Sequence, residues 1–123
     1  YVGLVSKEEM PDFLSNAKVL ALARPQSKQA EGGFPTKLGE YLATGKPVCV
    51  TKVGEIENYL EDGESAFMAE PDSVTSFADA LIRALTDKNA SEIGLKGRSV
   101  AFENFNKDIQ TKKLYDFLLQ NRK

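Results

Sequence analysis

The sequence predicts an α/β fold in which helices cover both faces of a parallel sheet. Two patterns support this prediction: apolar, strand-like segments alternate with amphipathic helical segments, and no internal repeat or linker interrupts the alternation. Strands of a parallel sheet are buried on both faces, so they read as apolar runs. The 123 residues are 41% hydrophobic and 28% charged, which suits one globular domain with its own core.

The first segments predict a strand, a short helix and a second strand. "YVGLV" at 1–5 is the first predicted strand, and Ser6 with Glu9 three residues later suits a capping turn. Pro11 fits the first turn of a helix over "PDFLSNA". "VLALA" at 19–23 is the second predicted strand. The chain lacks an initiator methionine and begins in a strand-like run, so we expect a piece of a longer protein.

A loop, a helix and a third strand follow. Residues 24–34 are polar and rich in glycine, which predicts a loop. A helix is predicted over 35–44, with Pro35 at its start and Gly45 as its C-terminal stop. "PVCVT" at 47–51 is the third predicted strand.

The remaining segments are mostly helical. A short helix is predicted at 55–60 and a fourth strand at 66–70. Ser73 suits the N-cap of the next helix, which carries Phe77, Leu81 and Leu85 on one face.

Two further helical patterns complete a helical tail over about 73–120. The first covers 90–103, where Gly94 and Gly97 weaken the helix by their low propensity. The second covers 107–120, and its apolar positions are Ile109, Leu114, Phe117 and Leu118.

Composition excludes several classes of function. The net charge of −2 provides no basic surface for nucleic acid, and no apolar run approaches the ~20 residues that span a bilayer. The absence of histidine removes serine–histidine and cysteine–histidine catalysis and the commonest zinc ligand. The single cysteine, Cys49, lies in an apolar run, which indicates a buried, reduced thiol in a cytoplasmic protein.

The junction between the loop at 24–34 and the following helix is the candidate binding site. In open α/β sheets, ligands lie beyond the carboxyl ends of strands, and free N–H groups at a helix start favour an anion. Gly32 and Gly33 allow a ligand to approach the backbone closely. Lys37 in the first turn is unfavourable by about 0.3–1 kcal/mol unless an anion offsets it.

Helical spacing divides the helix at 35–44 into two flanks. Leu38, Tyr41 and Leu42 form the core side, and Thr36, Lys37, Glu40 and Thr44 form the other. Phosphate suits the helix start, and a sugar diol suits the Glu40 carboxylate one turn later. The alternative interpretation is a turn followed by a solvated Lys37–Glu40 pair worth about 0.2–0.5 kcal/mol.

The whole segment resembles the C-terminal half-domain of a family 4 glycosyltransferase with the GT-B fold. The family pattern has a glutamate, a Gly-Phe-Gly-like turn, a second glutamate and then Ala-x-Ala-x-Gly-x-Pro-Val; "GGFPTKLGEYLATGKPVCVT" follows it from Gly33 to Thr51. The segments before and after this motif also match, so the resemblance covers nearly the whole chain. It implies a truncated sugar-nucleotide-binding domain over 1–123, with a Rossmann-like sheet that forms part of the GT-B C-terminal half.

The resemblance also implies the function and the roles of individual residues. Such enzymes use a nucleoside diphosphate sugar, need no metal or other cofactor and retain the anomeric configuration. Glu40 matches the glutamate that holds the ribose hydroxyls, and the backbone amides at Thr36 and Lys37 match those that meet the diphosphate. Gly33 and Phe34 match the turn under the donor sugar.

Two positions depart from the family pattern. Pro35 replaces a residue that often offers an N–H, so one donor is lost. The first motif glutamate should fall at position 32, but that residue is Gly32, and Glu31 lies one place earlier. Either the loop bulges so that Glu31 substitutes, or this subgroup lacks the carboxylate.

The resemblance sets further expectations for the protein as a whole. The acceptor, a glycan or a lipid-linked molecule, would bind to a missing N-terminal half, so the 123-residue chain alone should not turn over substrate. The family's terminal helix packs on that half, so the fragment could self-associate through Phe117 and Leu118. The expected location is the cytoplasm, with peripheral attachment at the inner membrane face left open for the parent protein.

Two other functions are alternatives to this interpretation. A non-catalytic nucleotide-binding or assembly module stays open because the first motif glutamate is missing. A response-regulator receiver domain needs an acidic pair directly after the first strand, and only Glu8 and Glu9 follow, beyond the strand. The acidic turn formed by Glu61, Asp62 and Glu64 is interpreted as solvated surface.

Overall fold

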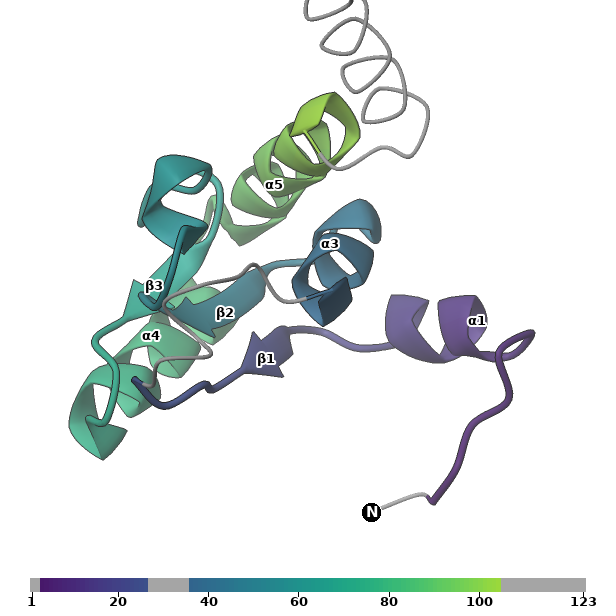
Figure 1. Cartoon of the computed structure of the whole chain (residues 1–123). Coiled ribbons are helices and arrows are strands. Elements are labelled where there is room, and N and C mark those ends of the chain that lie inside the picture. Colours follow the sequence, from purple (N-terminus) through teal and green to yellow (C-terminus); the bar gives the residue numbers. More distant parts are fainter. Residues whose placement is uncertain (1–2, 27–35, 105–123) are drawn as a thin grey trace, which may run out of the picture.

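A three-stranded parallel sheet forms the centre of the computed structural model, which describes residues 3–26 and 36–104 (Figure 1). The strands are β1 (Leu20–Leu22), β2 (Val48–Thr51) and β3 (Phe67–Ala69), and they lie in this order across the sheet. Both neighbouring pairs are parallel, which confirms the predicted α/β fold. Each strand lies inside a segment that the sequence predicts as a strand.

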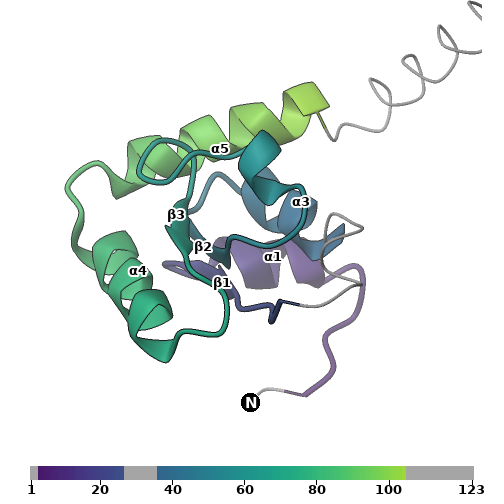
Figure 2. The same cartoon turned by 60° about the vertical axis from the view of Figure 1, so that its left-hand side comes forward.

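Helices cover both faces of the sheet (Figure 2). On one face, α3 (Thr36–Ala43) shares a core cluster with Val50 of β2. On the other, α4 (Val74–Thr86) packs against β2 and β3, and Cys49 belongs to this second cluster. Because successive strand residues point to opposite faces, β2 must be apolar throughout to sit between two helical layers.

The last described helix, α5 (Ala90–Asn104), packs closely against α3 and the turn that follows it. A Cβ added at Gly94 would lie 2.4 Å from the Gly45 carbonyl oxygen, and one at Gly97 would lie 2.5 Å from the Ser65 carbonyl oxygen. The helix is continuous through both glycines, although their propensity is low. They permit a backbone contact that any side chain would block.

The first helix is confirmed, but the first predicted strand is wrong over residues 3–5, the part of it that the structure describes. The Glu9 N–H donates to Ser6 Oγ over 3.2 Å, and α1 (Met10–Ser15) follows with a proline in its first turn. Residues 3–5 form no strand, and Leu4 is fully exposed. A strand exists only where a neighbour pairs with its backbone, and this segment runs below α1, away from the sheet (Figure 1).

The acidic turn is partly structural rather than wholly solvated. Asp62 Oδ1 accepts the Met68 N–H over 2.8 Å and Arg83 Nη2 over 3.1 Å. Arg83 Nη2 also donates to the Met68 carbonyl over 3.1 Å. Glu64 pairs with Lys96 of α5 over 3.2 Å, and both side chains are exposed. Asp62 therefore links the start of β3 to α4, which the sequence interpretation missed.

The N-terminus of α4 matches the prediction more closely than its C-terminal half. Ser73 Oγ accepts the Ser76 N–H over 3.1 Å, which confirms the N-cap. Phe77 and Leu81 pack against the core as expected, but Leu85 is half exposed. Small residues let this half of the helix lie close to the sheet. The buried positions of α4 are Ala80 and Ala84.

Two other predicted helices have different outcomes. The helix predicted at 55–60 is a single 3₁₀ turn, η1 (Ile56–Asn58). The helix predicted at 107–120, with Phe117 and Leu118, lies outside the described residues, so its packing and the expected self-association stay predictions. Among the helices of 3–26 and 36–104, none is long and apolar enough to cross a bilayer.

Candidate functional site

The helix that carries the candidate site has one buried flank and one exposed flank. Leu38 and Leu42 of α3 are fully buried in the core cluster, whereas Lys37 and Glu40 are exposed. This confirms the predicted division of the helix at these four positions. The buried flank holds α3 against the sheet, and the exposed flank is free to meet a ligand.

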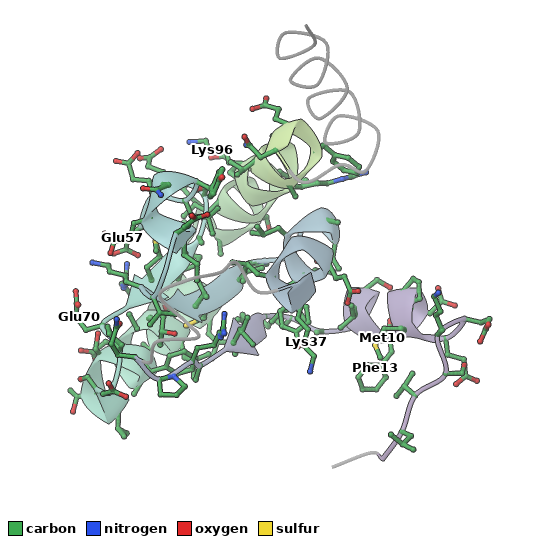
Figure 3. The ribbon with its side chains drawn as sticks, viewed as in Figure 1. Met10, Phe13, Lys37, Glu57, Glu70 and Lys96 are labelled. Atoms are coloured by element: carbon green, nitrogen blue, oxygen red, sulfur yellow. The ribbon has the colours of Figure 1, made fainter. Side chains whose placement is uncertain are left out.

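An open pocket of about 780 Å³ lies between α1 and α3, which neighbour each other in both cartoon views. Glu40 lines it from α3, and the apolar side chains of Met10 and Leu14 line it from α1. In Figure 3, the side chains of Met10 on α1 and Lys37 on α3 both point toward the bottom of the view. The remaining lining residues are Val5, Lys7, Pro11, Ser15, Ala43 and Thr44. The pocket thus combines a carboxylate with an apolar wall.

The start of α3 is electropositive. Its first turn contains no acidic residue and includes Lys37, so the free N–H groups and the ammonium have the same sign. Glu40 lies one turn further along. Among the residues that the structure describes, no ion pair joins Lys37 to Glu40. The alternative of a mutually satisfied surface pair therefore gains no support.

A buried hydroxyl holds the chain where it leaves β1 toward this site. Thr51, the last residue of β2, is 4% exposed. The Arg24 N–H donates to Thr51 Oγ1 over 2.9 Å, and the same hydroxyl donates to the Arg24 carbonyl over 2.9 Å. Both backbone groups of Arg24 are therefore satisfied by one side chain that comes from 27 residues away.

A second open pocket, of about 630 Å³, lies at the carboxyl ends of β1 and β2, beside the start of α4. Arg24, Thr51 and Phe77 contribute to its lining, together with Glu70. Glu70 Oε1 accepts a hydrogen bond from Lys52 Nζ over 3.1 Å, and this bond raises the pKa of the lysine. The pair is partly exposed, so it contributes little to stability.

Cys49 is a core residue, as predicted. It is fully buried between the sheet and α4, and burial raises the pKa of its thiol to about 11. A thiol in this environment stays protonated near neutral pH, so it is no nucleophile. Within 3–26 and 36–104, no cluster of three acidic, cysteine or histidine side chains could hold a metal ion.

The structure places only part of the predicted site. Lys37 and Glu40 lie on the exposed flank of α3, and Thr36 begins the helix. The loop residues Glu31, Gly32, Gly33 and Phe34 lie outside the described residues, so the question of which residue supplies the first glutamate stays open.

Sequence reasoning missed the α1 wall of the pocket and the Thr51 hydroxyl. A polar residue that closes an otherwise apolar strand was the available signal for Thr51. No comparable signal existed for α1, because its approach to α3 depends on tertiary packing. Thr44, predicted on the exposed flank, uses its hydroxyl locally: it donates to the Tyr41 carbonyl over 2.6 Å and accepts the Lys46 N–H over 3.1 Å.

Comparison with known proteins gives one family and several similar structures. The family model described as "Glycosyl transferases group 1" matches residues 1–87. Among curated proteins, the lipopolysaccharide 1,2-N-acetylglucosaminetransferase of Salmonella typhimurium is 32% identical over 98 residues, which cover 79% of this chain and 26% of that protein. The chain thus spans about a quarter of this relative's length.

Two solved structures have closely similar backbones. Sucrose-phosphate synthase from Thermosynechococcus elongatus has a TM-score of 0.78 at 25% identity, over 98% of this chain and 30% of that one. Anabaena Alr3699/HepE, in complex with UDP and glucose, has a TM-score of 0.81 at 18% identity, over 97% and 31%. The second likeness concerns the fold alone.

Proposed function

The chain belongs to the group 1 glycosyl transferases, and from this premise we propose that it is the donor-binding portion of an enzyme that transfers sugar from a nucleoside diphosphate sugar. Its sheet order and helical layers suit a Rossmann-like half of a GT-B fold, which the similar structures support. Membership of this family excludes the alternative of a response-regulator receiver domain. The observation that carries the proposal is the Glu40 carboxylate in the pocket between α1 and α3.

The nucleoside is proposed to occupy this pocket. Its volume of about 780 Å³ suits a small-molecule ligand. Glu40 would accept hydrogen bonds from the two ribose hydroxyls, and the apolar wall of Met10 and Leu14 would cover the base. Charge-assisted hydrogen bonds of this kind contribute about 1.5–3 kcal/mol each.

The diphosphate is proposed to meet the start of α3. The free N–H groups there and the Lys37 ammonium would interact favourably with its negative charge. The bound anion would also offset the unfavourable interaction between Lys37 and the electropositive helix start. Gly33 and Phe34 would lie under the donor sugar, with Gly32 and Glu31 beside it. Whether Glu31 supplies the missing carboxylate is part of the proposal to be tested.

Finer features of the reaction follow from the family resemblance. We expect retention of anomeric configuration, no metal or other cofactor, and a glycan or lipid-linked acceptor bound by another part of the parent protein. We expect that protein to work in polysaccharide biosynthesis at the cytoplasm, and peripheral attachment at the inner membrane face is a further proposal. HepE was solved with UDP and glucose, so UDP sugars are the first donors to test.

A ligand-detected NMR screen with UDP, GDP and ADP tests donor binding, followed by titration of the one that binds. Glu40→Gln should weaken nucleoside diphosphate binding about tenfold to a hundredfold, because it removes the charge that accepts the ribose hydrogen bonds. Glu57→Gln is the matched control: Glu57 is an exposed glutamate of η1 and lies away from α1 and α3 (Figure 3). Its affinity should be unchanged.

Two outcomes would contradict the proposal. Equal affinity of Glu40→Gln and the unmodified protein would disprove the ribose assignment, and Glu40 would then be an ordinary solvated surface residue.

Glu31→Gln should weaken only binding of the sugar conjugate, because Glu31 would reach the sugar and not the nucleoside. The 123-residue chain should also show no glycosyl transfer, and turnover of any nucleotide sugar would contradict its role as the donor half alone.

A further inference from the structure

We propose that Thr51 is a positioning residue for donor binding, because its hydroxyl fixes the point at which the chain leaves β1 for the donor site. The inference rests on the proposed function. Thr51 touches no ligand in this account, and it acts through the backbone of Arg24.

The hydroxyl continues the sheet where backbone pairing ends. The parallel pairing of β1 with β2 runs from Leu20 opposite Val48 to Leu22 opposite Val50, and no backbone pair follows. The side chain of Thr51 takes over at this point and satisfies both the N–H and the carbonyl of Arg24, each over 2.9 Å. A buried side chain with two such bonds holds the two peptide units on either side of the Arg24 Cα atom.

The backbone of Thr51 is held independently of its side chain. The backbone of Thr51 pairs with Ala69 of β3, and the next N–H, that of Lys52, donates to the Ala69 carbonyl over 2.8 Å. Loss of the hydroxyl therefore leaves β2 and β3 paired. It leaves the two backbone groups of Arg24 without partners, so the disturbance should concentrate where the chain departs from β1.

The other end of this connection is also fixed, because α3 is held to the sheet by Leu38 and Leu42. The predicted donor-binding motif therefore lies between two fixed points, Arg24 and Thr36. A shift of Arg24 would displace the start of the connection between β1 and α3 without touching the Glu40 pocket directly. In catalysis, a misplacement of about 1 Å can lower the rate about a hundredfold, and we expect a smaller loss in donor affinity.

The test compares Thr51→Val, which keeps the shape but removes the hydroxyl, with Thr51→Ser, which keeps the hydroxyl. We expect Thr51→Val to bind UDP-glucose about tenfold more weakly and Thr51→Ser to bind it within about twofold of the unmodified protein. Ser65→Ala is the matched control, because it removes another buried hydroxyl, one that accepts the Glu61 N–H over 3.0 Å far from β1. Its affinity should not change, although its stability falls.

The outcomes separate the two proposals. If the unmodified protein binds neither UDP nor UDP-glucose, the proposed function fails, and this inference fails with it. If the unmodified protein binds and Thr51→Val binds equally well, only the role of Thr51 is overturned. A loss in Thr51→Val that serine does not rescue, or an equal loss in Ser65→Ala, also overturns it, because a general loss of stability then explains the effect.

A second measurement applies if Thr51→Val fails to fold. Hydrogen exchange of the Arg24 amide in the unmodified protein should slow on saturation with UDP-glucose by at least about threefold more than the Met68 amide, which Asp62 holds elsewhere. Equal slowing of the two amides would show that donor binding is not coupled to the contact between Thr51 and Arg24, and it would overturn the inference.

Discussion

Replacement of Gly94 by alanine should destabilise the protein, although alanine is the better helix former. The added Cβ would lie 2.4 Å from the Gly45 carbonyl oxygen, 2.8 Å from the Lys46 carbonyl carbon and 2.9 Å from the Pro47 nitrogen. All three are backbone atoms of the turn between α3 and β2. No change of side-chain rotamer relieves the overlap, so α5 must move away from this turn or the turn must shift.

Two opposing effects determine the magnitude. Helix propensity favours alanine over glycine by about 1 kcal/mol. Added methyl groups in a well-packed interior are unfavourable by about 1–3 kcal/mol, and the upper part of this range applies because the neighbouring atoms are backbone. We therefore expect a net loss of about 1–2 kcal/mol in the free energy of unfolding.

Urea unfolding followed by circular dichroism measures the difference. With an m-value of about 2 kcal/mol/M, the midpoint should fall by roughly 0.5–1 M. Ser99→Ala on the exposed face of α5 is the control: it loses only an exposed hydrogen bond to the Leu95 carbonyl, and it should raise the stability by about 0.5 kcal/mol through helix propensity. If Gly94→Ala raises the midpoint as Ser99→Ala does, the close contact does not determine stability and the reasoning is refuted.

Two further predictions concern the core and the acidic turn. Between pH 9 and 11 the free energy of unfolding should fall by about 1.4 kcal/mol per pH unit, because the unfolded Cys49 thiol ionises near pH 9.0 whereas the buried thiol keeps its proton to about 11. Cys49→Val should remove this part of the pH dependence, and equal slopes in both proteins would contradict the assignment. Asp62→Ala should lower stability by about 1–3 kcal/mol, because the Met68 N–H loses its acceptor and Arg83 keeps only the Met68 carbonyl. Urea midpoints should show almost no effect of Glu61→Ala, an exposed neighbour, and an equal effect of the two changes would mean that the Asp62 contacts contribute nothing.

Much of the fold could be predicted because it depends on neighbours in the sequence. The cap by Ser73 and the stop at Gly45 involve residues within one or two turns, and the apolar runs identify β1, β2 and β3 directly. The two flanks of α3 follow from helical spacing alone. The same local rules failed for residues 3–5, because an apolar run becomes a strand only when another strand pairs with it.

The sequence by itself determined the family, the parallel α/β fold and the exposed flank of α3 with Lys37 and Glu40. Only the tertiary structure decided that α1 forms the second wall of the Glu40 pocket, that Thr51 holds Arg24, and that Gly94 permits a backbone contact. These contacts join residues tens of positions apart. Which residues meet in these contacts depends on strand order, register and helix packing, and these cannot be predicted from the local periodicity of the sequence.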